Sequence, residues 1–262
     1  MKECAYCGQS DRKITKEHVV NKAFLDEFYK IGVGFAKAYN NVTNNYLTIK
    51  DVCAKCNNEI LSELDDYFLE FYRQNLPKNL IKTNSKIEIS YDYSRLSRWL
   101  LKTIYNSERK NEYEHLERKM HRYKNYIIND APIDSLFKIY VEILGDVKKN
   151  ETKHLTDLPE DFNGKFNFLK LGTSILSNTV YNSEITKYFV SSNIVFHIFL
   201  IDKKEDLKEF NNRLYNYKFH SKIKDLYYLN PVKSKLKIKT SNRNIFDILD
   251  HTIEGEKSFI KQ

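Results

Sequence analysis

Two Cys-x-x-Cys pairs near the N-terminus have the residue type and the spacing of metal ligands. They contain all four cysteines of the 262-residue chain, Cys4, Cys7, Cys53 and Cys56. Two residues between thiolates let both sulfurs reach one metal, and two such pairs complete the closed tetrahedron of structural zinc. Gly8 directly follows the first pair, where a tight turn is needed. A redox pair or chance spacing are the alternatives, and no fifth cysteine or βαβ pattern supports them.

Further polar residues lie between and just after the cysteine pairs. Glu17 and His18 are adjacent in the segment between the pairs, and Asn57 directly follows the last cysteine. Simpler explanations exist for each: a surface Glu-His pair beside a structural zinc, and an Asn that only caps a helix. Asp65 is expected to be a solvated helix residue, and we assign it no metal.

The order of these motifs resembles the HNH endonucleases, the ββα-metal nucleases, in their zinc-stapled branch. The resemblance rests on Cys-x-x-Cys-Gly, on Thr-x-Glu-His-Val-Val from Thr15 to Val20, and on Val-Cys-x-x-Cys-Asn-Asn from Val52 with Leu-Asp further on. It covers about residues 1–70 and does not extend to residues 76–262.

The resemblance implies a mechanism for phosphodiester hydrolysis that leaves a 5′-phosphate. His18 matches the general base, and an imidazole with a pKa near 6.5 is neutral enough at pH 7 to accept a proton from water. Glu17 and Asn57 match the ligands of a catalytic metal, and their hard oxygen atoms favour Mg²⁺ or Mn²⁺. The metal would neutralise charge on the phosphate and stabilise the leaving 3′ oxygen.

The middle Asn of the family, which holds the loop that carries the His, has no clear counterpart. The usual spacing before the second cysteine pair falls on Thr48, whereas Asn44 and Asn45 come slightly earlier. We assign the role to Asn45 as the second catalytic residue, with Thr48 as the open alternative.

The elements that must position these residues follow from local patterns. Strands are expected at Ile14–Val20 and Tyr46–Val52, with a short helix or turn at Asn21–Leu25. Apolar residues at 3–4 spacing predict a helix over Asn57–Asn75. The predicted fold class is therefore α+β, with an N-terminal ββα-metal module over residues 1–76.

The middle segment, residues 77–146, contains basic residues that could contact nucleic acid. A strand is expected at Lys86–Tyr93, helices at Arg95–Asn111 and Glu112–Ile128, and a strand at Phe137–Leu144. The first helix carries basic side chains at roughly helical spacing, which we expect to bind phosphates: Arg95, Arg98, Lys102 and Arg109. Interleaved Glu residues leave an ordinary solvated helix as the alternative.

The remaining segment, residues 147–262, predicts a mixed α+β domain of unassigned role. It begins with a charged, irregular stretch over 147–164, where we place the domain boundary. Strands are expected at 166–171, 188–190, 194–201 and 235–240, and helices at 205–217 and 244–253. The segment from Val195 to Ile201 is nearly all apolar, which predicts a central strand buried on both faces. His197 within it is expected to be a core residue.

Composition limits the class of protein. The net charge is +8. Residues 1–75 contain 10 basic and 11 acidic side chains, so the excess of basic residues lies further along the chain. A basic surface suits a polyanion. No long apolar run or apolar signal region is present, so we expect a cytoplasmic protein that spans no membrane.

The resemblance to the HNH nucleases, together with the basic charge, implies a metal-dependent endonuclease that cuts double-stranded DNA, with structural zinc and catalytic Mg²⁺ or Mn²⁺. By analogy, such a protein would suit restriction or anti-phage defence. The alternative is a zinc-stabilised nucleic-acid-binding or adaptor protein without catalysis. The sequence leaves open the target site or base modification, DNA against RNA, and whether a protein partner or a second copy is needed.

Overall fold

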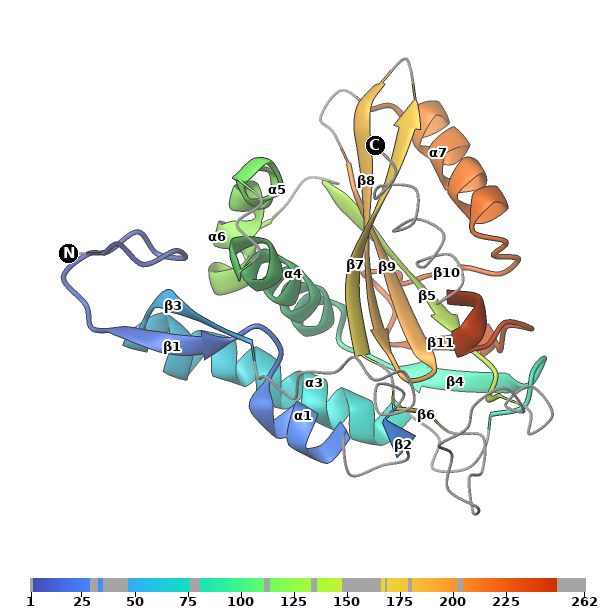
Figure 1. Ribbon diagram of the computed structural model, residues 1–262, viewed down its shortest axis with the longest axis horizontal. Coiled ribbons are helices and arrows are strands. Elements are labelled where there is room, and N and C mark those ends of the chain that lie inside the picture. Colours follow the sequence, from blue (N-terminus) through green and yellow to red (C-terminus); the bar gives the residue numbers. More distant parts are fainter. Residues whose placement is uncertain are drawn as a thin grey trace, which may run out of the picture.

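The computed structural model has a mixed α+β fold, as predicted (Figure 1). It describes residues 2–28, 33–34, 47–75, 81–110, 114–132, 136–147, 166–167, 169–178, 181–201 and 205–248. No helix in these ranges is long and apolar enough to cross a membrane.

The N-terminal region consists of a two-stranded sheet followed by a long helix. Strand β1 (Ile14–His18) pairs antiparallel with β3 (Thr48–Cys53), and a register shift lies between Thr15 and Glu17. Helix α1 (Lys22–Phe28) follows β1, and the Asn21 side chain accepts a hydrogen bond from the Ala23 N–H at its start. The predicted helix over Asn57–Asn75 is confirmed, as a π-helical turn η1 (Cys56–Leu61) that continues into α3 (Ser62–Asn75).

Helix α4 (Tyr93–Lys110) lies between this region and the large sheet (Figure 1). Its indole Trp99 stacks on Phe68 of α3 with ring centroids 3.4 Å apart, and the same indole meets Phe189 of the sheet edge-on. The second predicted helix is broken into α5 (Glu114–Met120), a 3₁₀ turn η2 (His121–Tyr123) and α6 (Lys124–Asn129). The left-handed Asp130, with φ 52°, ends α6.

A five-stranded antiparallel sheet has the strand order β10-β5-β9-β8-β7. Its strands are β5 (Phe137–Ile143), β7 (Leu169–Asn178), β8 (Tyr181–Ser191), β9 (Ile194–Leu200) and β10 (Tyr227–Tyr228). The predicted central strand is confirmed, because β9 is buried throughout and pairs with β5 and β8. Phe196 faces the core beside α3, whereas Phe199 packs under α7 (Leu207–His220).

Two pairings join segments that the sequence assigned to separate units. Strand β5 lies before the predicted boundary at 147 and pairs with β9 beyond it. Strand β4 (Lys86–Ser90) likewise pairs with β11 (Lys235–Lys239). Residues 77–146 are therefore not a unit separate from residues 147–262, because backbone hydrogen bonds of both sheets connect them. The irregular stretch behind the boundary prediction lies almost wholly outside the described residues.

A short strand pair and the start of a C-terminal helix lie outside the larger sheets. Strands β2 (Val33–Gly34) and β6 (Phe166–Asn167) form a short parallel pair. The last predicted helix begins as expected, since residues 245–248 are helical, and its remainder lies outside the described ranges. One hydrophobic core runs from Cys4 through α3 and α4 to Ile238, so it includes residues from all three predicted units.

Candidate functional site

The four cysteines gather as the sequence predicts. Their sulfur atoms all lie within 4.8 Å of one another, and none is in a disulfide. A zinc ion about 2.3 Å from each sulfur needs sulfurs about 3.8 Å apart, and the Cys7–Cys53 separation is 3.7 Å. Burial raises the pKa of the Cys4 thiol, but backbone N–H groups, that of Cys53 first, outweigh it and lower the pKa to about 7. The cluster can therefore hold a metal such as zinc.

Gly8 has the role expected from its place after the first pair. Its φ is +74°, in the left-handed region that glycine adopts at little cost. A Cβ there would meet no atom within 4 Å, so the requirement is conformational and not one of crowding. The turn from Cys4 to Gly8, here called the knuckle, is joined to the small sheet by a hydrogen bond from the Ala5 N–H to the Asp51 carbonyl, 2.8 Å long.

Asn57 anchors the start of the helix to β1. Its Nδ2 donates to Thr15 Oγ1 and to the Lys16 carbonyl, both at 2.9 Å. It is therefore not the helix cap that a common use of Asn would suggest. With both N–H groups donated, its Oδ1 is the atom that can accept from, or ligate, another group.

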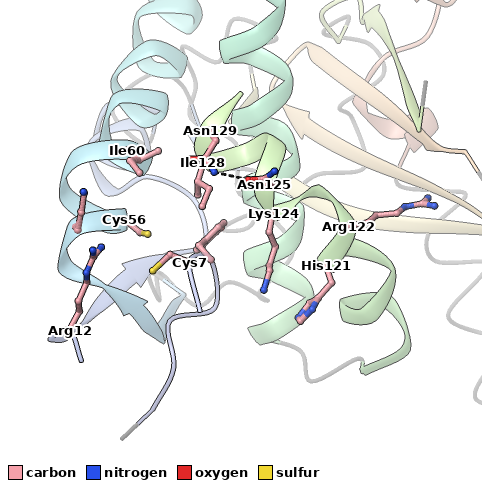
Figure 2. Close-up of a pocket in the computed structure, with 12 residues that line it drawn as sticks. Cys7, Arg12, Cys56, Ile60, His121, Arg122, Lys124, Asn125, Ile128 and Asn129 are labelled. Atoms are coloured by element: carbon pink, nitrogen blue, oxygen red, sulfur yellow. Dashed lines mark hydrogen bonds between the residues drawn. The ribbon is translucent and has the colours of Figure 1, made fainter. Parts of the chain in front are cut away.

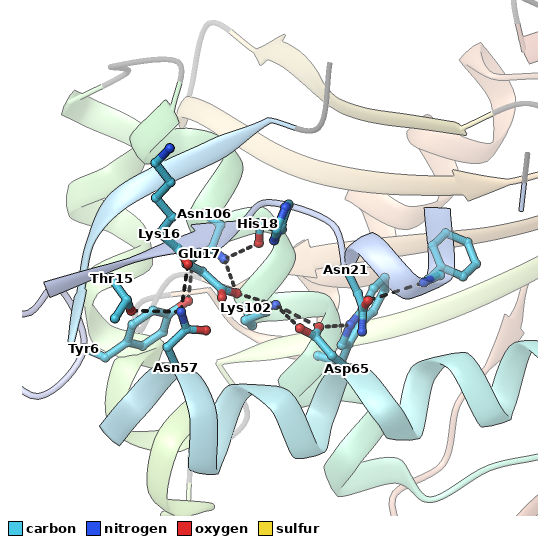
Figure 3. Close-up of polar contacts among 12 residues, drawn as sticks. Tyr6, Thr15, Lys16, Glu17, His18, Asn21, Asn57, Asp65, Lys102 and Asn106 are labelled. Atoms are coloured by element: carbon cyan, nitrogen blue, oxygen red, sulfur yellow. Dashed lines mark hydrogen bonds and ion pairs between the residues drawn. The ribbon is translucent and has the colours of Figure 1, made fainter. Parts of the chain in front are cut away.

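Glu17 belongs to a buried ionic cluster that the sequence does not reveal (Figure 3). Lys102 Nζ lies 2.6 Å from Glu17 Oε1 and 2.8 Å from Asp65 Oδ1. The Lys102 side chain is 0% exposed and that of Glu17 is 4% exposed. Burial raises the pKa of Glu17 despite Lys102. Burial would lower the pKa of Lys102, but Asp65 and Glu17 outweigh it and raise that pKa.

Asn106 of α4 connects the knuckle, Glu17 and His18. Its Oδ1 accepts from the Tyr6 hydroxyl at 2.7 Å, and its Nδ2 donates to Glu17 Oε1 and the His18 carbonyl, both at 3.3 Å. The hydrogen bond to the His18 carbonyl fixes the end of β1 to α4. The residue has no sequence signal, because its partners lie 88 to 100 positions away.

His18 ends β1 and is half-buried. Burial lowers the pKa of its imidazole, and the positive charge of Lys102 lowers it further. The ring is therefore neutral at pH 7 and able to accept a proton. Figure 3 shows the His18 ring pointing away from Asn57 and Lys102, while Asn57 contacts β1 at Thr15 and Lys16.

Asn45 and Thr48 are the two candidates for the middle position of the motif. Asn45 lies outside the described residues. Thr48 is the β3 residue paired directly with His18 across the sheet. Which of the two fills the middle position stays a prediction.

Glu17 and Asn57 are the residues that the resemblance assigns to a hard divalent cation. Among the described residues, the four cysteines are the one group of three or more His, Cys, Asp or Glu side chains placed to share an ion. Mg²⁺ needs only one or two protein oxygens because it keeps several waters, but Glu17 Oε1 already lies 2.6 Å from Lys102 Nζ and accepts from Asn106. Glu17, Asp65 and Lys102 leave one net negative charge when all three are ionised, and a catalytic metal at Glu17 and Asn57 stays a prediction.

Two of the four predicted phosphate contacts are corrected by the structure. Lys102 is fully buried between Glu17 and Asp65. Arg109 has a side chain 4% exposed, pairs with Asp51 at 3.0 Å and lies over the Tyr105 ring. Neither can reach a nucleic acid, because both neutralise carboxylates inside the protein.

The other two predicted contacts lie closer to the surface. Arg95 is exposed and pairs with Asp92, three residues earlier on the same helix. Arg98 is half-buried, and its Nε donates to the Ile127 carbonyl at 2.9 Å. Both remain predictions for phosphate contact.

Comparison with protein-family models, with curated proteins and with solved structures found no match. The function must therefore be argued from the site itself.

Proposed function

We propose that this protein is a metal-dependent endonuclease that hydrolyses phosphodiester bonds, with DNA as the expected substrate. The observation that carries the proposal is the placement of His18, Glu17 and Asn57 by one small unit. A strand ends at His18, and a helix that starts at the cysteine cluster brings Asn57 against the same strand. This order of strand, strand and helix beside four clustered cysteines is what the resemblance to the HNH nucleases implies.

Zinc in the cysteine cluster would be structural, since four thiolates leave no open position. Its role would be to fix β3 and the first turn of the helix, and so the register of His18 against Thr48.

In this proposal His18 accepts a proton from the attacking water. Its lowered pKa keeps the imidazole neutral at pH 7, and general-base catalysis of this kind contributes about 10²- to 10⁴-fold. Asn106 holds the His18 carbonyl, and thereby the end of the strand. A divalent metal held by Glu17 and Asn57 would supply charge stabilisation at the phosphate.

A plasmid nicking assay tests the proposal. Purified wild type, His18→Ala and His220→Ala are compared with Mg²⁺ or Mn²⁺ and with a chelator of those ions. His220 lies on an exposed face of α7 and is the matched control. Strand breaks should appear in the wild type and His220→Ala, and should fall by about 10² or more in His18→Ala at unchanged zinc content. Equal cleavage by His18→Ala would remove His18 from the mechanism.

A second candidate is favoured by Lys102. Its buried ammonium already neutralises Glu17, the residue that a catalytic metal would need. A zinc-stabilised nucleic-acid-binding or adaptor protein without catalysis would have this arrangement and no need for a second metal. That candidate predicts salt-sensitive binding and no strand breaks with either ion in any of the variants.

A further inference from the structure

A cleft lies beside the cysteine cluster, with Cys7 and Cys56 in its lining (Figure 2). Its volume is about 420 Å³, in the range of small-ligand sites of roughly 300–1,000 Å³. One wall carries Arg12, Lys55 and Ile60, and the other carries Lys124, Asn125 and Ile128. The walls come from the knuckle with the start of the helix, and from η2 with α6, respectively.

The chemistry of the cleft favours an anion that also has apolar surface. None of the described lining residues carries a carboxylate, whereas Arg12, Lys55 and Lys124 are cationic. Ile60 and Ile128 offer apolar contact for a base or a sugar. Asn129 Nδ2 donates to Asn125 Oδ1 at 2.6 Å, which orients the Asn125 amide so that its N–H groups can donate. Figure 2 shows Arg122 turned away, and that side chain donates to the Ile201 carbonyl.

The cysteine cluster offers a competing explanation for these cations. Four thiolates around Zn²⁺ carry two net negative charges. Desolvation would lower the pKa of Arg12, but the hydrogen bond to Cys53 and the negative charges of Cys7, Cys53 and Asp11 together raise it. Arg12 therefore serves the cluster at least in part. With the Asp11 carboxylate beside Arg12, these negative charges account for Arg12 and leave Lys55 and Lys124 as the cations that face the cleft. Lys124 approaches from a different element, with no cysteine contact among those recorded for the described residues.

We propose that this cleft binds the phosphodiester backbone of a nucleic acid next to the cleaved segment. The inference rests on the proposed function only for the identity of its ligand. Arg12 of the cleft comes two residues before β1, whereas His18 ends β1, and four residue steps of strand span about 13 Å. That distance corresponds to about four nucleotides along a duplex. The cleft would therefore hold flanking nucleic acid while His18 faces the cut.

Fluorescence anisotropy with a labelled DNA duplex, and with RNA and DNA single strands of the same sequence, tests the proposal across a range of salt. The variant Arg12→Gln/Lys55→Gln/Lys124→Gln should bind the preferred probe roughly tenfold more weakly at about 0.1 M salt, and its log K against log [salt] slope should fall by about 2 to 3. The control Lys224→Gln/Lys237→Gln/Lys239→Gln removes the same charge from exposed positions elsewhere and should bind like the wild type.

Zinc content, measured on every variant, separates the two explanations. If the triple variant loses zinc, the double variant Lys55→Gln/Lys124→Gln decides: lost affinity at full zinc content supports the cleft, and wild-type affinity overturns it. Wild-type affinity and slope in a zinc-loaded triple variant also overturn it. His18→Ala should lose cleavage but bind normally. Binding through the cleft without any cleavage by the wild type would refute the nuclease and leave the cleft standing.

Discussion

Two buried lysines of this protein stand in contrasting surroundings. Lys102 of α4 lies between the carboxylates of Glu17 and Asp65. Lys187 of β8 lies 2.6 Å from Glu108, a residue of the same helix α4. Burial alone would lower both pKa values. The pKa of Lys102 is nevertheless raised by its two carboxylates, whereas that of Lys187 is lowered because Glu108 does not offset the burial.

The difference shows what a second carboxylate does in a protein interior. Beside Glu108, burial still lowers the pKa of Lys187, whereas the two carboxylates beside Lys102 raise its pKa and leave a net negative cluster. The Lys102 cluster is thus a fixed charge near His18, and the Lys187 pair is a structural link between α4 and the sheet.

Removal of the metal should have the largest effect and should act on the Lys102 side. Structural zinc contributes about 10–16 kcal/mol in zinc-finger peptides at pH 7. Cys53→Ala, or a strong chelator, should abolish amide-exchange protection in β1, β3 and η1. Protection in β8 and β9 should persist, since Phe189 and Phe196 pack in the large core. Uniform loss of protection across both regions would show that the two form one cooperative unit.

Replacing each lysine by Met should show the next largest difference. Lys102→Met leaves two buried carboxylates without their cation, which should cost about 3–5 kcal/mol of unfolding free energy. Lys187→Met leaves only Glu108, which should cost about 1–3 kcal/mol. Urea denaturation measures both. Restored stability in Lys102→Met/Glu17→Gln/Asp65→Asn would trace the loss to charge, and equal costs for the two single variants would contradict the comparison.

The pH dependence of the Lys187 contribution should be the smallest effect. Since its folded pKa is lowered, the unfolded chain binds more protons between that value and about 10.4, the ordinary pKa of Lys. Wild type should therefore gain stability relative to Lys187→Met as pH rises through this window. The gain is at most about 1.4 kcal/mol per pH unit. Denaturation midpoints of both proteins at several alkaline pH values check it, and a constant difference would mean that the pKa is not lowered.

Sequence patterns found the features that depend on neighbours along the chain. The spacing of Cys4, Cys7, Cys53 and Cys56 predicted a cluster, and the apolar run around Phe196 predicted a buried strand. The prediction that Lys102 contacts phosphate failed, because a basic residue on a helix has the same spacing whether it faces water or a carboxylate. Glu17 and Asp65 are distant in sequence, and only the packing of α4 against the N-terminal region brings them there.

The packing of α4 also means that residues 1–76 depend on the rest of the chain for part of their core and for charge neutralisation. A fragment that ends there would expose the face of Phe68 that Trp99 covers, and would leave Glu17 and Asp65 without Lys102. Tyr6 would lose the Asn106 oxygen that accepts its hydroxyl. A graft of the cysteine region onto another protein would therefore have to include α4, although α4 contributes no cysteine and no His to the site.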